Sequence, residues 1–319
     1  MNTGKKSSLL VCAWALIALS AAACSKKPQA SAPDSAKAPG AEAHKPEAAP
    51  APAAVTATAA PAAATPVEAA PAEADPIKNG WNLPPRATTA KDGDRIYVLT
   101  QGKDRSYTNN AAVYHLFAHD LGEIKGDVMT VKELGGGTFK VTGLFIIPAG
   151  LAKPDEVKNG DMVLAEWASS LKHAQVTKVD GDKITVRYTD LPDNWGDDKL
   201  VAVKTQREVT KQKDGFSPGN FAVAIEDEQP VQVLLIAESG DKWLAKRFAG
   251  RVGVFATKDI KPIPIKPSLK TGQMVQVPWV GRMYKGKIKK ITGTRVEVAV
   301  DGIATKEPVV TSLGQILPE

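Results

Sequence analysis

Residues 160–167 read Gly160-Asp161-Met162-Val163-Leu164-Ala165-Glu166-Trp167, and two similar runs follow at 174–179 and 183–190. Side chains in these runs alternate between apolar and polar and are rich in β-branched and aromatic types. This period of two is typical of half-buried antiparallel strands. Asp180-Gly181-Asp182 between the second and third runs predicts a tight hairpin, because Gly accepts a positive φ. A fourth strand is expected at 200–203.

The same unit recurs three times. It starts near Gly93, near Gly219 and near Gly272, so that the start-to-start spacings along the chain are 67, 59 and 53 residues. Units two to four each end in a similar apolar tail, at Val209-Thr210, Ile263-Pro264 and Ile316 to Pro318. A period that drifts with loop insertions is typical of a duplicated small barrel rather than a regular solenoid.

The repeat resembles the Tudor and SH3-like small barrels over roughly residues 90 to 319. Trp167 and the run Val186 to Asp190 are similar to the Tudor strand that carries cage aromatics, and Trp279 with Tyr284 to Ile288 is similar to the Tudor opening. The resemblance implies a fold. It does not carry over a ligand, because small barrels share such patterns without a shared function. The predicted fold class is therefore mainly β, in tandem small antiparallel barrels.

The N-terminus has the features of a secretory signal. Lys5 and Lys6 precede an apolar run of 11 residues, 9–19, which is too short to span a bilayer. Small residues 21–23 then lead to Cys24, as in the bacterial lipobox, although Ala21 stands where Leu is usual. Two interpretations stay open: a lipidated Cys24, or ordinary cleavage that leaves a lone thiol. We expect lipidation, and Ser25 after it suggests an outer-membrane lipoprotein of a Gram-negative-type bacterium, facing the periplasm or the cell surface.

Residues 25–76 form an expected tether. They hold 21 Ala and 10 Pro among 52 residues and no aromatic residue. Such a composition cannot bury enough apolar surface to offset chain entropy, so we expect a disordered linker that acts as a spacer. The predicted organisation is a signal peptide at 1–23, Cys24 and linker at 24–76, and β units at 77–156, 157–212, 213–266 and 267–319.

The first unit contains a segment that fits a helix, from Asn110 to Glu123. Val113, Leu116, Phe117 and Leu121 fall at helical spacing. This helix would place His115 and His119 on one face, beside Asp120, at a spacing that can hold a divalent metal. No third ligand is evident, so we expect no metal and two ordinary histidines, one exposed and one packed.

Two groups of residues are candidate binding sites. Trp167, Tyr188 and Trp195, with Asp190 as counter-charge, could line an aromatic pocket for a cation or a sugar ring, or they could belong to the barrel core. In the last unit Arg282, Lys285, Lys287 and Lys289 lie along one strand and could bind an anionic polymer, or they could guard a sheet edge against pairing.

Composition and missing motifs narrow the function. The whole chain carries a formal charge of +6, and so does the expected folded part, because the +2 of the signal offsets the −2 of the linker. That charge is too weak and spread to predict nucleic-acid binding. No catalytic signature or dinucleotide fingerprint occurs, so we expect no enzyme and no cofactor. The sequence predicts a binding module, with cell-wall glycan such as peptidoglycan or an envelope protein as partner; a docking subunit of a larger envelope assembly is the alternative, and a metal-dependent enzyme ranks third.

Overall fold

The computed structural model describes residues 79–101, 107, 113–133, 136–150, 155–191 and 200–319. All of them belong to one compact unit, residues 68–319. The signal, Cys24 and the Ala/Pro-rich linker predicted before residue 77 lie outside the described residues. Within the described ranges, no helix has the length and apolar character needed to cross a bilayer.

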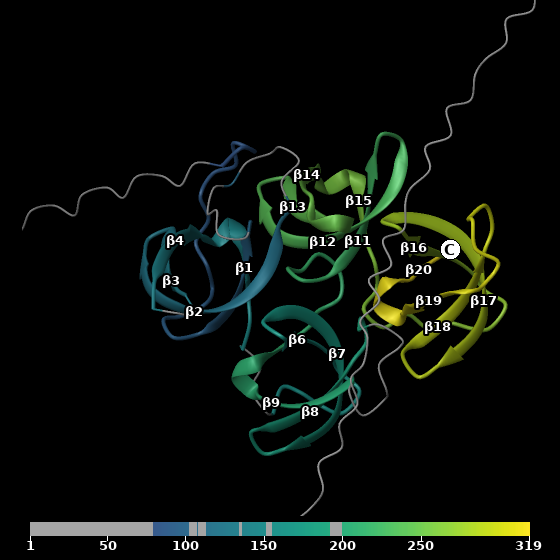
Figure 1. Cartoon of the computed structure of the whole chain (residues 1–319), viewed down its shortest axis with the longest axis horizontal. Helices are drawn as coiled ribbons and strands as arrows, with labels where there is room; N and C mark the ends of the chain where they lie inside the picture. Colours follow the sequence, from purple (N-terminus) through teal and green to yellow (C-terminus); the bar gives the residue numbers. More distant parts are fainter. Residues whose placement is uncertain (1–78, 102–106, 108–112, 134–135, 151–154, 192–199) are drawn as a thin grey trace, which may run out of the picture. The chain divides into compact units, whose positions relative to one another are not determined.

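The described chain folds as four five-stranded units, which we call barrels 1 to 4 (Figure 1). Barrel 1 comprises β1 (Arg95–Thr100), β2 (His115–Lys125), β3 (Val128–Lys132), β4 (Thr138–Thr142) and β5 (Ile146–Pro148). Barrel 2 comprises β6 (Met162–Trp167), β7 (Ser170–Asp180), β8 (Lys183–Tyr188), β9 (Val201–Thr205) and β10 (Val209–Lys211). Barrel 3 comprises β11 (Phe221–Glu226), β12 (Gln229–Ser239), β13 (Lys242–Arg247), β14 (Val252–Ala256) and β15 (Ile260–Pro262). Barrel 4 comprises β16 (Met274–Trp279), β17 (Arg282–Thr292), β18 (Arg295–Val300), β19 (Val309–Ser312) and β20 (Leu317–Pro318).

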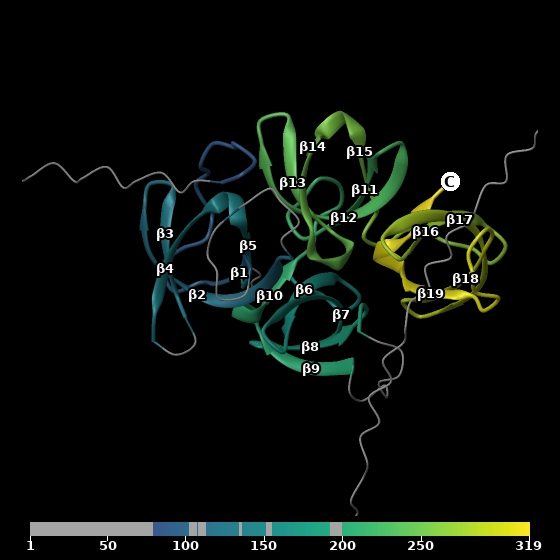
Figure 2. The same cartoon turned by 45° about the horizontal axis from the view of Figure 1, so that its top comes forward.

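Each barrel has the same connectivity. The four consecutive strands pair as an antiparallel meander, and the fifth strand returns to pair with the first, as β10 does with β6. Figure 2 shows this closure most clearly for the ring of β6 to β10. A 3₁₀ turn precedes the fifth strand in every barrel: η1 (Gly143–Phe145), η3 (Gln206–Glu208), η5 (Thr257–Asp259) and η6 (Leu313–Gln315). The prediction of tandem small antiparallel barrels is confirmed.

A repeated glycine sets the register of each barrel. The glycines at the four predicted starts all have a positive φ, and the amide of each donates to a carbonyl at the bend of its barrel's second strand. The four pairs are Gly93 with Leu121 (3.0 Å), Gly160 with Val176 (2.8 Å), Gly219 with Leu235 (2.7 Å) and Gly272 with Ile288 (2.8 Å). Each second strand is 11 residues long and has its register shift at that carbonyl residue. Barrel 1 therefore shares the backbone pattern of the other three.

The helix predicted over 110–123 is wrong in its described part, and residues 110–112 lie outside the described residues. Residues 115–123 lie in β2, and the buried side chains of this strand include Leu116, Ala118 and Leu121. The apolar spacing of this segment fits both the helical period of about 3.6 residues and the strand period of 2. It does so because β2 bends at its register shift and presents both faces to packed neighbours. The tertiary pairing of β2 with β1 and β3 decides between them.

Each barrel has its own hydrophobic core, and the core of barrel 1 extends into two other barrels. Barrels 2, 3 and 4 each enclose a cluster of small branched residues and one or two aromatics. The cluster of barrel 1 also takes in residues of two other barrels, including Leu164 and Leu171 of barrel 2 and Leu234 and Ile236 of barrel 3. This shared core fits the expectation that barrels of 50 to 60 residues, which are marginal alone, pack against each other.

Candidate functional site

The two histidines of the metal hypothesis do not meet. His115 is exposed and its ring stacks on Phe117, whereas His119 is buried with its Nδ1 3.3 Å from the Lys132 carbonyl. Residues four apart on a strand are separated by about 13 Å, which is too far for one metal ion. No group of metal-ligating side chains forms among the described residues.

Trp167 and Tyr188 lie together, as the sequence suggested, but inside barrel 2. Their rings meet edge to face at 5.0 Å between centroids. Tyr188 is 2% exposed, and its hydroxyl donates to the Glu166 carbonyl. Burial, followed by the nearby Glu166 carboxylate, raises the pKa of Tyr188 far above its usual range. This placement favours the core interpretation of the pair, and Trp195 lies outside the described residues.

Asp190 has a different partner from the one expected. Its Oδ2 lies 2.9 Å from Nδ1 of His173, and its Oδ1 accepts the His173 amide at 3.1 Å. The other ring nitrogen of His173 lies 2.8 Å from the Gly219 carbonyl, and the ring stacks on Phe221 at 4.5 Å. Asp190 therefore helps to join barrel 2 to barrel 3, instead of standing as a counter-charge in an aromatic cage.

The basic strand of barrel 4 is β17. Arg282, Lys285, Lys287 and Lys289 are all exposed on it, and Met283 and Ile288 of the same strand are buried. Lys285 forms an ion pair with Glu319 at 3.0 Å, in which the lysine side chain stays 71% exposed. All four cations are thus accessible to solvent.

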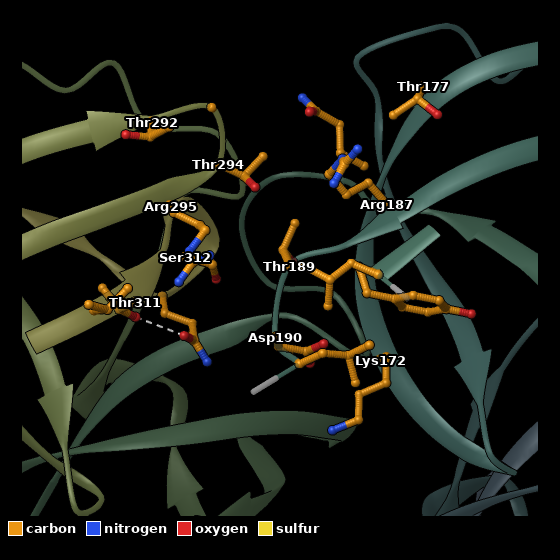
Figure 3. Close-up of a pocket in the computed structure, with 17 residues that line it drawn as sticks. Lys172, Thr177, Arg187, Thr189, Asp190, Thr292, Thr294, Arg295, Thr311 and Ser312 are labelled. Atoms are coloured by element: carbon orange, nitrogen blue, oxygen red, sulfur yellow. Dashed lines mark hydrogen bonds between the residues drawn. The ribbon is translucent and has the colours of Figure 1, made fainter. Parts of the chain in front are cut away.

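A groove of about 690 Å³ lies between barrels 2 and 4 (Figure 3). One wall comes from β7, β8 and the residues that follow β8; the other comes from the β17–β18 turn, β19 and η6. Hydroxyl and amide side chains dominate the lining: Thr177, Thr189, Thr292, Thr294, Thr311, Ser312, Gln175 and Gln315. Tyr188 and Asp190 from the predicted site also line it, together with two leucines, Leu191 and Leu200.

The groove also carries positive charge. Lys172, Arg187 and Arg295 line it, against Asp190, which is engaged with His173. Lys172 forms no ion pair within the described part of the chain. Burial, and then the charge of Lys172, lower the pKa of Lys246 on β13. The three cations of the lining outnumber its one carboxylate, Asp190, which favours an anionic group in the ligand.

Sequence reasoning missed the groove. Its walls come from segments more than 100 residues apart, and a threonine on a strand surface has no local signature of binding. His173 was missed as well, because a lone histidine in an alternating strand does not indicate which barrel it will contact.

Comparisons with known proteins add little. No family model matches the chain, and no curated protein matches it. Among solved structures, the four MBT repeats of Drosophila melanogaster Sfmbt, in complex with the peptide RHR(me)KVLR, are similar at 10% identity. That similarity covers 72% of this chain and 88% of the other, with a TM-score of 0.16. At that score we draw no argument from the likeness.

Proposed function

We propose that this chain is a membrane-anchored envelope lipoprotein whose barrels form a non-catalytic binding module, and that cell-wall glycan binds in the groove between barrels 2 and 4. The observation that carries the proposal is the lining of this groove, in which eight hydroxyl or amide side chains accompany Lys172, Arg187 and Arg295. A hydroxyl-rich polymer with carboxylates, such as peptidoglycan, offers the matching donors, acceptors and charges.

The histidine nearest the groove supports a binding role over a catalytic one. A general base needs a ring nitrogen that can reach a substrate. In His173 one nitrogen faces Asp190 and the other faces the Gly219 carbonyl, and the residue is only 6% exposed. His173 is therefore a structural residue in this proposal.

The anchor is the second part of the proposal. Lipidation of Cys24 would hold the module at the outer membrane, and the linker at 25–76 would let the barrels reach the wall. Labelling cells with a palmitate analogue tests the anchor: the label should appear on the wild-type chain and disappear from Cys24→Ser. A chain that stays unlabelled in both cases would contradict lipidation without affecting the groove.

Co-sedimentation with purified peptidoglycan sacculi tests the groove, with a soluble chain that begins at Ser25. We expect saturable pelleting, and for Lys172→Glu an affinity lower by about tenfold, because a charge-assisted contact worth about 1.4 kcal/mol would become repulsive. Lys258→Glu is the matched control, since Lys258 is an exposed lysine of barrel 3 that does not line the groove. Equal pelleting of both variants would place the site elsewhere, and no pelleting of the wild type would reject the glycan.

A docking subunit of a larger envelope assembly is the second candidate. An exposed apolar pair favours it: Phe248 is 60% exposed and Val280 is 66% exposed. The two lie side by side, because a Cβ at Gly281 would come within 2.5 Å of the Phe248 Cβ. Crosslinking in intact cells that captures an envelope protein at this pair, in a chain that does not bind sacculi, would favour this candidate over glycan binding.

A further inference from the structure

Barrels 1 and 2 are joined through a hairpin. The β6–β7 turn, Ala168-Ser169, lies against the open edge of β2, where the Ala118 amide donates to the Ser169 carbonyl at 2.7 Å. In the same contact, Phe117 of β2 pairs with Ser170 of β7. This single bridge joins the strands of the two barrels into one ten-stranded sheet.

Barrels 3 and 4 repeat this junction. The β16–β17 turn, Val280-Gly281, lies against the edge of β12, where the Gln232 amide donates to the Gly281 carbonyl at 3.0 Å and Val231 pairs with Arg282. Phe117 and Val231 are each the third residue of an 11-residue strand, so the two junctions use the same position of the barrel.

In both junctions the amide that donates to the neighbouring hairpin belongs to the fourth residue of the second strand, Ala118 in barrel 1 and Gln232 in barrel 3. We call this place in each barrel the docking position. In barrel 2 the fourth residue of the second strand is His173. Its amide donates to Asp190, and its ring contacts Gly219 and Phe221 of barrel 3. In barrel 4 it is Lys285. No hairpin of the described chain pairs with β17 at Lys285, since the pairing with β12 is confined to Arg282, β16 pairs on the other side, and β18 begins to pair at Gly286. An open strand edge presents unpaired backbone groups to another β element.

A second hairpin has the backbone conformation of the β6–β7 turn but docks on no other barrel among the described residues. Ala168 and Ser169 have φ values of 47° and 61°, and Asp227 and Glu228 in the β11–β12 turn have the same values. Both residues of this second turn are exposed, and no hydrogen bond joins their backbone to another barrel among the described residues. Among the described residues, the four barrels therefore leave one matching hairpin and one matching edge.

The charges of the unused hairpin and edge are opposite. The hairpin carries the carboxylates of Asp227 and Glu228, and the β17 edge carries the cations of Arg282 and Lys285. Phe248 and Val280 belong to the same surface, because both line a cavity together with Glu226 and the arginines Arg247, Arg251 and Arg282. An apolar patch between an acidic element and a basic one is self-complementary, as a two-fold symmetric interface requires.

We infer that this surface binds a second copy of the chain, with the hairpin Asp227-Glu228 of each copy against the β17 edge of the other at Tyr284-Lys285. The Lys285 amide donates to the Glu228 carbonyl of the second copy, as the Gln232 amide donates to Gly281 within one chain. Phe248 and Val280 are buried between the copies. This dimer does not depend on the groove or on its ligand.

A charge swap tests the dimer by sedimentation equilibrium of the soluble chain from Ser25. The wild type should be dimeric at about 100 µM, within the range of weak specific interfaces. Asp227→Lys with Glu228→Lys, and separately Arg282→Glu with Lys285→Glu, should each be monomeric, because like charges then face each other. An equimolar mixture of the two double variants should form dimers again, because both contacts regain opposite charges.

The matched control is Lys242→Glu with Lys258→Glu, which changes two exposed lysines of barrel 3 outside this surface and should leave the dimer intact. A wild type that stays monomeric would overturn the inference, as would charge variants that stay dimeric alone or stay monomeric when mixed. Circular dichroism of every variant checks that the barrels are folded. Lys285→Pro, which removes the edge amide but keeps the apolar patch, should weaken the dimer at least tenfold.

Discussion

His173 and Asp190 are in buried contact, 2.9 Å between Nδ1 and Oδ2, at the boundary of barrels 2 and 3. The histidine side chain is 7% exposed and the aspartate side chain 13%. Both ring nitrogens face acceptors, since Nε2 lies 2.8 Å from the Gly219 carbonyl.

Asp190→Ala should therefore destabilise the chain strongly. It removes the partner of a buried ring and the acceptor of the His173 amide, which together should cost about 3 kcal/mol of the free energy of unfolding. Urea denaturation measures the change. Asp180→Ala is the control, because Asp180 pairs with Lys178 at 70% exposure and should change stability by less than about 0.5 kcal/mol. Equal effects of the two substitutions would contradict the structural role of Asp190.

Gly150 should tolerate no side chain. Its φ is +72°, and a Cβ there would lie 1.8 Å from the Arg207 carbonyl oxygen, a backbone atom of the turn η3 in barrel 2. Gly150→Ala should cost more than about 3 kcal/mol, since the end of barrel 1 must move away from η3.

Gly181→Ala separates crowding from backbone strain. Gly181 also has a positive φ, +57°, but a Cβ added there would meet no atom within 4 Å. This change should cost only about 1 kcal/mol, the ordinary penalty of a left-handed alanine. Thermal unfolding of the two variants compares them, and a loss at Gly150 no larger than at Gly181 would show that barrels 1 and 2 do not meet at Arg207.

Val280 is strained in the β16–β17 turn. It has a φ of +48°, which a β-branched residue adopts at a cost, and its side chain is 66% exposed. Val280→Asn would give the Asn-Gly pair that two-residue hairpins of this kind favour, and it should stabilise the chain by about 1 kcal/mol. The control Val203→Asn, at a similarly exposed site in the interior of strand β9, should not stabilise it. Urea midpoints of the two variants measure the difference.

Much of the fold could be predicted from local patterns. Period-two alternation and the glycine at each start, as at Gly160 and Gly272, act within a few residues and therefore leave a mark in the sequence. The strand β2 was mistaken for a helix because its apolar residues fit both periods and only pairing with β1 and β3 decides. The groove could not be predicted, since Lys172 and Thr294 come together only when barrels 2 and 4 are packed.

Two carboxylates of barrel 2 should make the chain sensitive to acid. Burial alone would raise the pKa of Asp161, but the Lys211 ammonium at 2.9 Å and the Lys158 amide outweigh it and hold that pKa below its usual range. Burial likewise opposes the shift of Glu208, whose pKa is lowered by the amide and hydroxyl of Thr205 and by Lys204. Lowered carboxylate pKa values add stability that is present above their ordinary values, near pH 4, and is lost as the pH falls through the values of the folded state.

Asp161→Asn should therefore be less stable than the wild type at pH 7 and lose less stability between pH 5 and pH 2, so that the two curves converge in acid. The same comparison with Asp180→Asn, whose carboxylate is largely exposed, should show two nearly parallel curves. Urea midpoints measured across that pH range give both pairs of curves. If the gap between wild type and Asp161→Asn were constant with pH, the ion pair with Lys211 would contribute nothing to the acid response of barrel 2.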